Sequence, residues 1–296
     1  MKKTISLCAL ALSILALSIL AFPAAAAEVA VSTQASNFCF DDSGELNPDT
    51  PRFGVSASVS DRISDSLDGS VFFDRDPFTG NLLGARAAYH TSFLIISAGP
   101  TFGLLNSDGE KGSVKLLFQP GMGIGFKIAL PGYFLATADT DFALPPASRS
   151  EGQAYLQRGE LSAGFYLPNV ICTAKASQRN SSIAHALGDE VKCVTDYGLY
   201  TEAFKKGSPF RISIDFIYRI MQYAAKDPAA DPVKIGNLIL GTGATWSPNT
   251  NMSFFARMNG ALYSFTLNED VDNLDKFMYD VSIGARILTK SPKGIE

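Results

Sequence analysis

Apolar and polar residues alternate with a period of two along most of this chain. From position 210 to 221, one parity carries Phe210, Ile212, Ile214, Phe216, Tyr218 and Ile220, and the other carries Arg211, Ser213, Asp215, Ile217, Arg219 and Met221. Positions 277–287 repeat the pattern. Because successive side chains of a β-strand point to opposite faces, this alternation predicts strands with one apolar and one polar face.

The same alternation predicts about fourteen strands along the chain. They lie near residues 28–38, 52–63, 66–75, 80–91, 92–106, 112–130, 132–142, 153–167, 169–178, 190–205, 208–222, 233–247, 250–266 and 275–289. Tight joints such as Ser64-Asp65 and Pro168-Asn169 alternate with longer, more charged ones such as 39–51 and 144–152. Short and long connections at opposite ends are typical of antiparallel barrels in outer membranes.

The stretch QPGMGIGF, residues 119–126, resembles a glycine-rich phosphate loop. A dinucleotide fingerprint requires a third glycine where this chain has Phe126, and a helix after it. Here Gly121, Gly123 and Gly125 share one parity of the alternation instead. We interpret the stretch as a strand whose glycines leave room on one face.

The N-terminus has the features of a secretory signal. Lys2 and Lys3 precede an apolar run, which is followed by Pro23 and the alanines 24–27. We expect residues 1–27 to be a signal peptide cleaved after Ala27, with a retained membrane helix as the alternative, and residues 28–296 to form a single barrel domain. The mature chain then has 23 basic and 29 acidic residues, a balance that argues against nucleic acid as a partner.

These observations favour an all-β fold, namely a closed antiparallel transmembrane β-barrel. The chain is 46% hydrophobic, yet after the signal no apolar run approaches the ~18 residues of a spanning helix. In hydrocarbon every backbone polar group must be paired, which a closed sheet achieves. A soluble β-sandwich also alternates and is the competing interpretation. Aromatic residues near predicted strand ends fit interfacial girdles, as follows: Phe53, Tyr89, Tyr133, Tyr197, Phe210, Trp246 and Phe277.

With the closing segment FMYDVSIGARIL, residues 277–288, the chain resembles bacterial outer-membrane β-barrels, and its architecture is similar to that of monomeric fourteen-stranded porins of the OmpG type. The resemblance implies the bacterial cell outer membrane, outer-membrane lipids around the barrel, and the barrel-assembly machinery as a partner during insertion. Such barrels usually end on an aromatic residue, whereas this chain continues to Glu296. FadL-type barrels also have fourteen strands, but they carry a long N-terminal plug, for which few residues precede Arg52.

The polar parity would then face the lumen and carry charges of both signs. Charged groups on a pore wall select ions, and the near balance of signs predicts weak selectivity. The alternative is that these groups pair across strands and fill the interior. The row Arg211, Asp215 and Arg219 is the strongest candidate for a constriction or a salt-bridge ladder. The full set of lumen candidates is Arg211, Asp215, Arg219, Lys127, Arg86, Arg257, Arg286 and Asp280.

From this pattern we predict a porin-like channel for passive diffusion of small hydrophilic solutes. One alternative is a structural or adhesion barrel with a blocked lumen. Another is a channel for hydrophobic compounds of the FadL or OmpW sort, for which apolar residues on the inner parity could form a pocket. These residues are Phe72, Leu117, Leu156, Ile171 and Ile217.

Candidate chemistry is sparse in the rest of the chain. The two histidines, His90 near a predicted turn and His185 in a predicted outer loop, are accompanied by no GxSxG or HExxH motif, so we expect no enzymatic activity, no cofactor and no metal. Cys172 and Cys193 share the apolar parity on strands expected to be neighbours. Secretion permits a disulfide between them, with two lipid-facing thiols as the alternative, and Cys39 is expected to stay unpaired.

Overall fold

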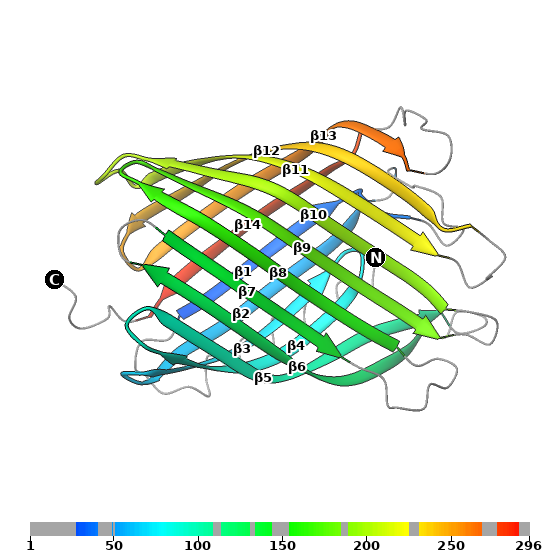
Figure 1. The fold of residues 1–296 in the computed structure, drawn as a ribbon, viewed down its shortest axis with the longest axis horizontal. Helices are drawn as coiled ribbons and strands as arrows, with labels where there is room; N and C mark the ends of the chain where they lie inside the picture. The colour runs from blue at the N-terminus through cyan, green and yellow to red at the C-terminus, as the bar shows by residue number, and fades with distance from the viewer. Residues whose placement is uncertain are drawn as a thin grey trace.

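The computed structural model describes residues 28–40, 49, 51–108, 114–130, 134–143, 154–184, 189–224, 231–267 and 277–289. These residues form a closed antiparallel barrel (Figure 1). Its strands are β1 (Glu28–Ser36), β2 (Arg52–Ser64), β3 (Leu67–Asp76), β4 (Gly80–His90), β5 (Leu94–Asp108), β6 (Val114–Leu130), β7 (Phe134–Ala143), β8 (Ala154–Leu167), β9 (Val170–Ala184), β10 (Asp189–Phe204), β11 (Phe210–Ala224), β12 (Val233–Asn249), β13 (Met252–Thr266) and β14 (Tyr279–Leu288). The predicted fold class and the expected fourteen strands are confirmed.

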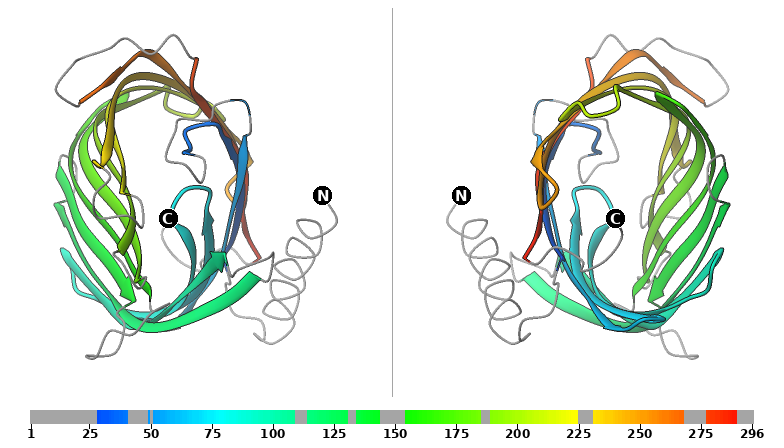
Figure 2. Two further views of the ribbon diagram at one scale, coloured as in Figure 1. Left: turned by 90° about the vertical axis from the view of Figure 1, so that its right-hand side faces the viewer. Right: turned by 90° about the vertical axis from the view of Figure 1, so that its left-hand side faces the viewer.

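Each strand pairs with its neighbours in sequence, and β1 closes the ring against β14. The closing ladder runs without a register shift from Glu28 opposite Leu288 to Ser36 opposite Asp280. Viewed along its axis, the wall forms an oval ring around an interior (Figure 2). Closure leaves no strand edge unpaired, which is the condition for a sheet to lie in hydrocarbon.

The connections differ at the two ends of the barrel, as the sequence predicts. One end, called the turn end here, has the short joints, for example residues 65–66 and 168–169. The other, called the loop end, has the joints between β1 and β2, β3 and β4, β5 and β6, β7 and β8, β9 and β10, β11 and β12, and β13 and β14. Both β1 and β14 have their outer termini, Glu28 and Leu288, at the turn end.

Most strand bounds differ from the predicted ones by a few residues, and two of these differences have a clear physical reason. The first strand ends at Ser36 rather than 38, because the chain leaves the wall at Asn37 and turns into the lumen. The ninth strand continues to Ala184 rather than ending at 178. Its extension, Arg179-Asn180-Ser181-Ser182, is polar on both faces, so it lacks the alternation, yet it stays paired with β8 and β10.

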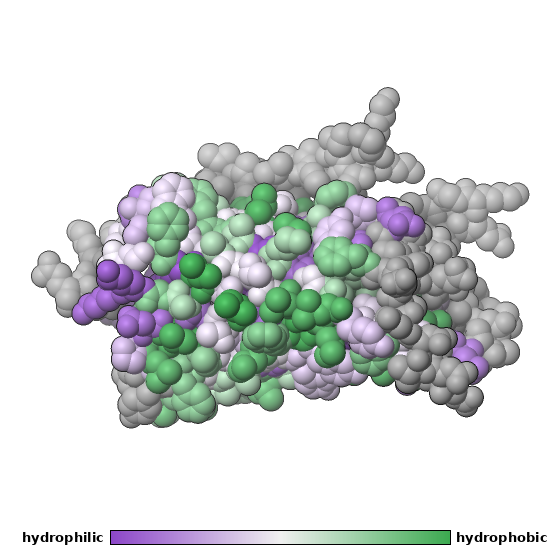
Figure 3. All heavy atoms as spheres, turned by 90° about the horizontal axis from the view of Figure 1, so that it is seen from above, coloured by the Kyte–Doolittle hydropathy of each residue, from purple (hydrophilic) through white to green (hydrophobic). Residues whose placement is uncertain are grey.

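The outer face of the wall is apolar across its middle. On β11, Phe210, Ile212, Ile214 and Phe216 are exposed on this face, whereas Asp215 and Arg219 on the opposite face are buried. Figure 3 shows hydrophobic residues gathered over the middle of one side of the barrel, with hydrophilic residues toward the ends. Six of the seven expected girdle aromatics are exposed, and Tyr133 lies outside the described residues. This distribution is that of a lipid-facing band.

Within the described part of the chain, no helix is long and apolar enough to cross a membrane.

Candidate channel lumen

The inner face of the wall encloses a polar cavity. Its volume is about 730 Å³, and it is lined by residues of β1, β7 to β11, β13 and β14. Five basic residues line it, namely Arg158, Lys175, Arg179, Arg219 and Arg257, and five acidic residues do so as well, namely Asp139, Asp141, Glu160, Asp196 and Asp280. The lining is therefore charged but balanced in sign, as the sequence predicts for the lumen.

The glycines of QPGMGIGF face this interior and make space for Arg86. A Cβ atom at Gly123 would lie 2.7 Å from Nη2 of Arg86, and one at Gly125 would lie 3.1 Å from its Nη1. The guanidinium of Arg86 reaches across β5 and β6 to donate to Asp139 and Asp141 on β7, each at 2.5 Å. The predicted space is thus occupied by one arginine that is fixed by two carboxylates, a strong charge-assisted arrangement.

A chain of ion pairs crosses the interior nearer the loop end. Arg179 on β9 contacts Asp76 at 2.5 Å and Asp196 on β10 at 3.5 Å. Arg219 on β11 donates two hydrogen bonds to Asp196, at 2.8 and 3.0 Å, and a third to Asp280 on β14 at 3.1 Å. Asn259 donates to the other oxygen of Asp280 at 2.6 Å. Apart from Arg179, whose side chain is partly exposed, these groups are buried, so the network depends on complete pairing.

The end of the β3–β4 hairpin folds inward and is fastened to the opposite wall. One carboxylate oxygen of Asp76 accepts hydrogen bonds from the backbone N–H groups of Phe78 and Thr79, at 2.8 and 2.7 Å, and the other oxygen accepts from Arg179. Arg158 on β8 pairs with Asp74 and donates to the carbonyl of Gly80 at 2.8 Å. Gly80 has a φ of 128°, a conformation that favours glycine. The turn is therefore both locally ordered and tied to β8 and β9.

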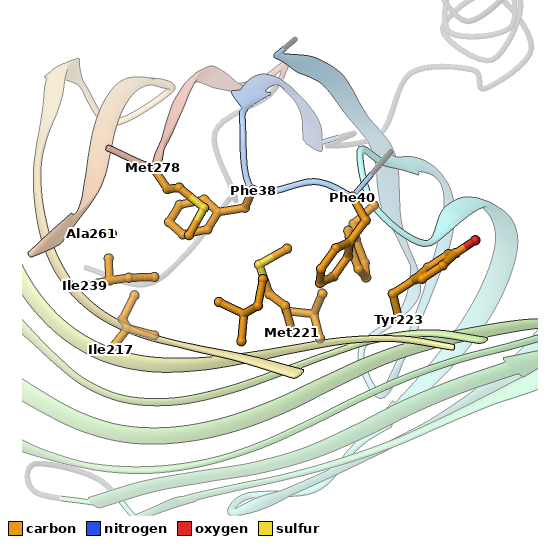
Figure 4. Close-up of a cluster of buried hydrophobic side chains, with 11 residues drawn as sticks. Phe38, Phe40, Ile217, Met221, Tyr223, Ile239, Ala261 and Met278 are labelled. Carbon is orange, nitrogen blue, oxygen red and sulfur yellow. The ribbon is translucent and has the colours of Figure 1, made fainter. Parts of the chain in front are cut away.

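Residues 37–40 and 76–80, called the lumenal plug here, carry an apolar cluster into the lumen. Phe38 and Phe40 point toward Ile217, Met221 and Tyr223 on the wall (Figure 4). The ring of Phe40 lies 5.9 Å from that of Phe78 and 5.7 Å from that of Tyr223. The guanidinium of Arg219 lies 4.7 Å from the centroid of Phe38, so it joins the plug to the ion-pair chain.

The plug narrows the loop end of the lumen. Figure 2 shows the segment after β1 and the end of the β3–β4 hairpin inside the ring. The space left between Phe38, Phe78, Arg179 and Arg219 is about 10 Å³, which is at the lower limit for one water molecule. A second apolar group, Leu82, Ala143 and Leu156, packs with Phe72 and Ile183 across the interior.

The predicted row Arg211, Asp215 and Arg219 lies on one inner face, but it does not form a ladder along its own strand. Arg211 pairs with Glu202 near the turn end, at 2.9 Å, and both side chains are substantially exposed. Asp215 faces Arg257 at 3.2 Å, and Arg219 belongs to the cross-lumen network. Arg211 and Arg219 are eight residues apart, or about 27 Å along the strand, so they cannot share one constriction.

The remaining lumen candidates also have inner positions. Arg286 contacts Glu28 at 2.6 Å at the turn end, and Lys127 has the parity of the inward glycines on β6. Sequence reasoning missed Asp76 and Phe38 as lumen residues. Phe38 and Phe40 continue the parity of Ser36 on β1, which points inward, and this was the available signal.

Of the two alternatives for Cys172 and Cys193, the disulfide is contradicted by the structure. Both are free thiols, with Cys172 opposite Thr201 and Cys193 opposite Asn180. The two positions are eight residues apart along β10, about 27 Å, whereas a disulfide requires Cα atoms within about 7 Å. The error arose because the expected ninth strand ended six residues too early, which misplaced the hairpin.

The described residues include one histidine and no cluster of metal-binding side chains. His90 lies at the turn end with its Nε2 2.7 Å from Asp68, and His185 lies outside the described residues. The part of the chain that the structure describes contains no group of three or more His, Cys, Asp or Glu residues placed to hold a metal ion.

The fold is shared with solved structures of outer-membrane proteins. No protein-family model and no curated protein matches the sequence. The CymD monoaromatic hydrocarbon channel matches with a TM-score of 0.55 at 11% identity, over 90% of this chain and 89% of that one. The Ralstonia pickettii toluene transporter TbuX gives 0.52 at 9% identity, over 90% of each chain. An outer-membrane channel from Pseudomonas putida F1 gives 0.51 at 9% identity, over 90% of this chain and 97% of that one. The chain therefore has the fold of bacterial outer-membrane β-barrels.

Proposed function

We propose that the protein is an outer-membrane channel through which small hydrophilic solutes diffuse. The observation that carries the proposal is the polar cavity of about 730 Å³, lined by equal numbers of basic and acidic side chains, inside a closed barrel with an apolar outer band. Water-filled barrels have this division between a wet lumen and an oily exterior. In keeping with it, we place the mature chain in the outer membrane after cleavage of residues 1–27.

The charge balance of the lining supports weak ion selectivity. Most of the charged groups are held against a partner of opposite sign, as Lys175 is with Glu160 and Arg257 with Asp215. Paired charges present a small net field to a passing ion, so anions and cations are expected to cross at similar rates. We expect no enzymatic step, because a passive channel needs none.

Liposome swelling tests this function. The purified protein is reconstituted in liposomes, and influx of arabinose and glycine is compared with that into protein-free liposomes. Because the plug narrows the loop end, we expect slow influx with the intact protein and faster influx with the variant Phe38→Ala/Phe40→Ala. The variant empties much of the plug and replaces no charged residue, although it removes the ring on which the guanidinium of Arg219 lies.

The folded state is checked by the faster migration of the unheated barrel on SDS gels. Folded wild type and folded variant that both give no influx of either solute would contradict the channel function and would favour a surface barrel with a blocked lumen.

A second candidate is a channel for hydrophobic compounds. Two observations favour it: the apolar cluster around Phe38 and Phe40 at the loop end, and the names of the CymD and TbuX channels, which are similar in fold. Of the inner apolar residues expected from the sequence, Phe72, Leu156 and Ile217 lie in the interior clusters. Ile171, opposite Glu202, belongs to neither cluster, and the side chain of Leu117 lies outside the described residues. Saturable binding of toluene to the protein, without influx of arabinose, would favour this candidate.

A further inference from the structure

The lumenal plug closes a passage that continues below it, and this raises the question of how a solute passes. The polar cavity lies beneath the plug, and Arg179 and Arg219 border both the cavity and the small pocket at the plug. If the channel function proposed above holds, a solute must pass the level of Phe38 and Phe78. Either the plug is permanent, or it moves.

The two parts of the plug are joined to the wall by one chain of contacts. Asp76 orders the β3–β4 turn with one carboxylate oxygen and binds Arg179 with the other. Arg179 also contacts Asp196, and Asp196 holds Arg219, whose guanidinium lies over the ring of Phe38. The hairpin end and the segment after β1 therefore share these ion pairs, in addition to their separate contacts with Arg158 and Arg52.

Breaking the contact between Asp76 and Arg179 has consequences for both parts. The hairpin end then keeps the attachment of Asp74 and Gly80 to Arg158 but loses its tie to β9. Arg179, released from Asp76, competes with Arg219 for Asp196, because both guanidinium groups already contact Oδ2 of that carboxylate. Weaker fixation of Arg219 in turn weakens the contact that holds Phe38.

The position of Asn37 supplies a hinge for this motion. It is pinned to the wall by three hydrogen bonds, to the carbonyls of Tyr279 and Phe277, each at 3.1 Å, and from the backbone N–H of Tyr279 at 2.6 Å. The next three residues are buried in the lumen, where Phe38 and Phe40 pack in the apolar cluster and the carbonyl of Phe40 accepts a hydrogen bond from Arg52 on β2 at 3.0 Å. Residues 38–40 can therefore swing about Asn37 once the hydrogen bond from Arg52 to Phe40 breaks, and the ladder between β1 and β14 stays closed.

The use of ion pairs to hold the plug against the wall also favours a movable plug. Apolar side chains would hold a permanent plug at least as well, because buried ion pairs recover little more than the cost of removing their charges from water. Ion pairs exchange partners, and the Arg179 side chain keeps 23% of its surface exposed. A solute or water in the cavity can therefore reach the Arg179 side chain of this ion pair.

We propose that the lumenal plug is a gate, that the Asp76–Arg179 ion pair is its clasp, and that residues 38–40 and the β3–β4 turn leave the lumen together when the clasp opens. The inference rests on the proposed channel function, and it adds how passage through that channel is controlled.

Cys39, within the plug and only 2% exposed, provides the test. In the mature background Cys172→Ser/Cys193→Ser it is the sole cysteine. The protein is reconstituted in liposomes with a water-soluble sulfonatoethyl methanethiosulfonate on both sides, and labelling of Cys39 is followed by mass spectrometry. We expect Asp76→Asn to raise the labelling rate at least about tenfold over the background, because a broken buried ion pair shifts an equilibrium by that much or more.

Two further variants make the result specific. Arg179→Gln removes the other partner of the clasp and is expected to raise labelling similarly, and it replaces Asp76→Asn if that variant does not fold. Asp139→Asn is the matched control, because it removes a lumenal carboxylate paired with Arg86 that contacts neither part of the plug. Its labelling rate should equal that of the background. Labelling in the folded clasp variants that is no faster than in Asp139→Asn would overturn the gate.

Arabinose influx into the same liposomes separates the gate from the channel function. Faster labelling with faster influx supports both. Faster labelling without influx supports a movable plug in a barrel that is no channel for this solute. Influx at the background level with unchanged labelling overturns the gate while it leaves the channel in place.

Discussion

Replacing Arg219 with alanine is expected to destabilise the barrel by about 3–5 kcal/mol, because it leaves buried carboxylates without their partner. Arg219 has a side chain only 8% exposed and makes three hydrogen bonds to Asp196 and Asp280. Its loss also removes the cation from the ring of Phe38. The measurement is urea unfolding in lipid vesicles, followed by loss of the fast-migrating unheated form on SDS gels.

Arg211→Ala is the matched control for this prediction. It changes the same residue type on the same face of β11, but its ion pair with Glu202 is 51% exposed at the arginine. Exposed ion pairs contribute about 0–1 kcal/mol, so the urea midpoint should hardly move. Equal midpoints for the two variants would contradict the buried network as a source of stability.

Gly121→Ala is expected to have the second largest effect, a loss of about 3 kcal/mol or more, because the added methyl group meets backbone. A Cβ at this position would overlap the carbonyl oxygen of Phe142 and lie 2.5 Å from the Cα of Ala143. Backbone in a paired strand cannot move aside as a side chain can. The β6–β7 ladder would have to open at its loop end, where Gly121 pairs with Ala143. Folding yield and urea midpoint are the measurements.

Gly159→Ala tests whether the effect comes from contact or from the general loss of glycine. It lies on β8, and a Cβ there would meet nothing closer than 3.8 Å. Since glycine is disfavoured inside strands, this variant should be neutral or slightly more stable. A loss of stability as large as that of Gly121→Ala would refute the steric explanation.

The fold could be predicted from the sequence because a barrel wall separates lipid from water. On β11 the alternation of Phe216 with Asp215 assigns each residue to the oily or the wet face, and the structure agrees. Closure was predicted because every backbone polar group must be paired in hydrocarbon, and it is seen in the pairing of β1 with β14. Outside the apolar band the alternation of apolar and polar residues ends, because both faces of the strand contact water there. The extension of β9 to Ala184 was missed for this reason.

The pairing partners of the lumenal charged residues could not be predicted from the sequence. The glycines at 123 and 125 indicated free space, but not that Arg86 fills it, because its partner Asp139 lies 53 residues away on β7. The cross-lumen pairing of Arg219 with Asp280 likewise joins residues 61 apart. Alternation assigns a side chain to a face, whereas partners across the lumen depend on the height and curvature of the closed ring.

The plug is an intermediate case. Ile217, Met221 and Tyr223 share the inner parity of β11, and Phe38 and Phe40 share that of β1. A lumen filled only with water would not favour these apolar residues, so the sequence held a signal for an apolar body inside the barrel. It did not reveal that the body comes from the two chain segments after β1 and β3.

The central claim is that one face of the wall contacts lipid and the other water, and Trp246 tests it most directly. It is the only tryptophan in the chain, points outward near the turn end of β12 with 45% of its surface exposed, and stacks on Phe210 and Phe254. In vesicles of brominated lipid we expect its fluorescence to be strongly quenched, most by bromine near the headgroups, and to be nearly insensitive to acrylamide. Strong quenching by acrylamide together with no quenching by brominated lipid would contradict the account.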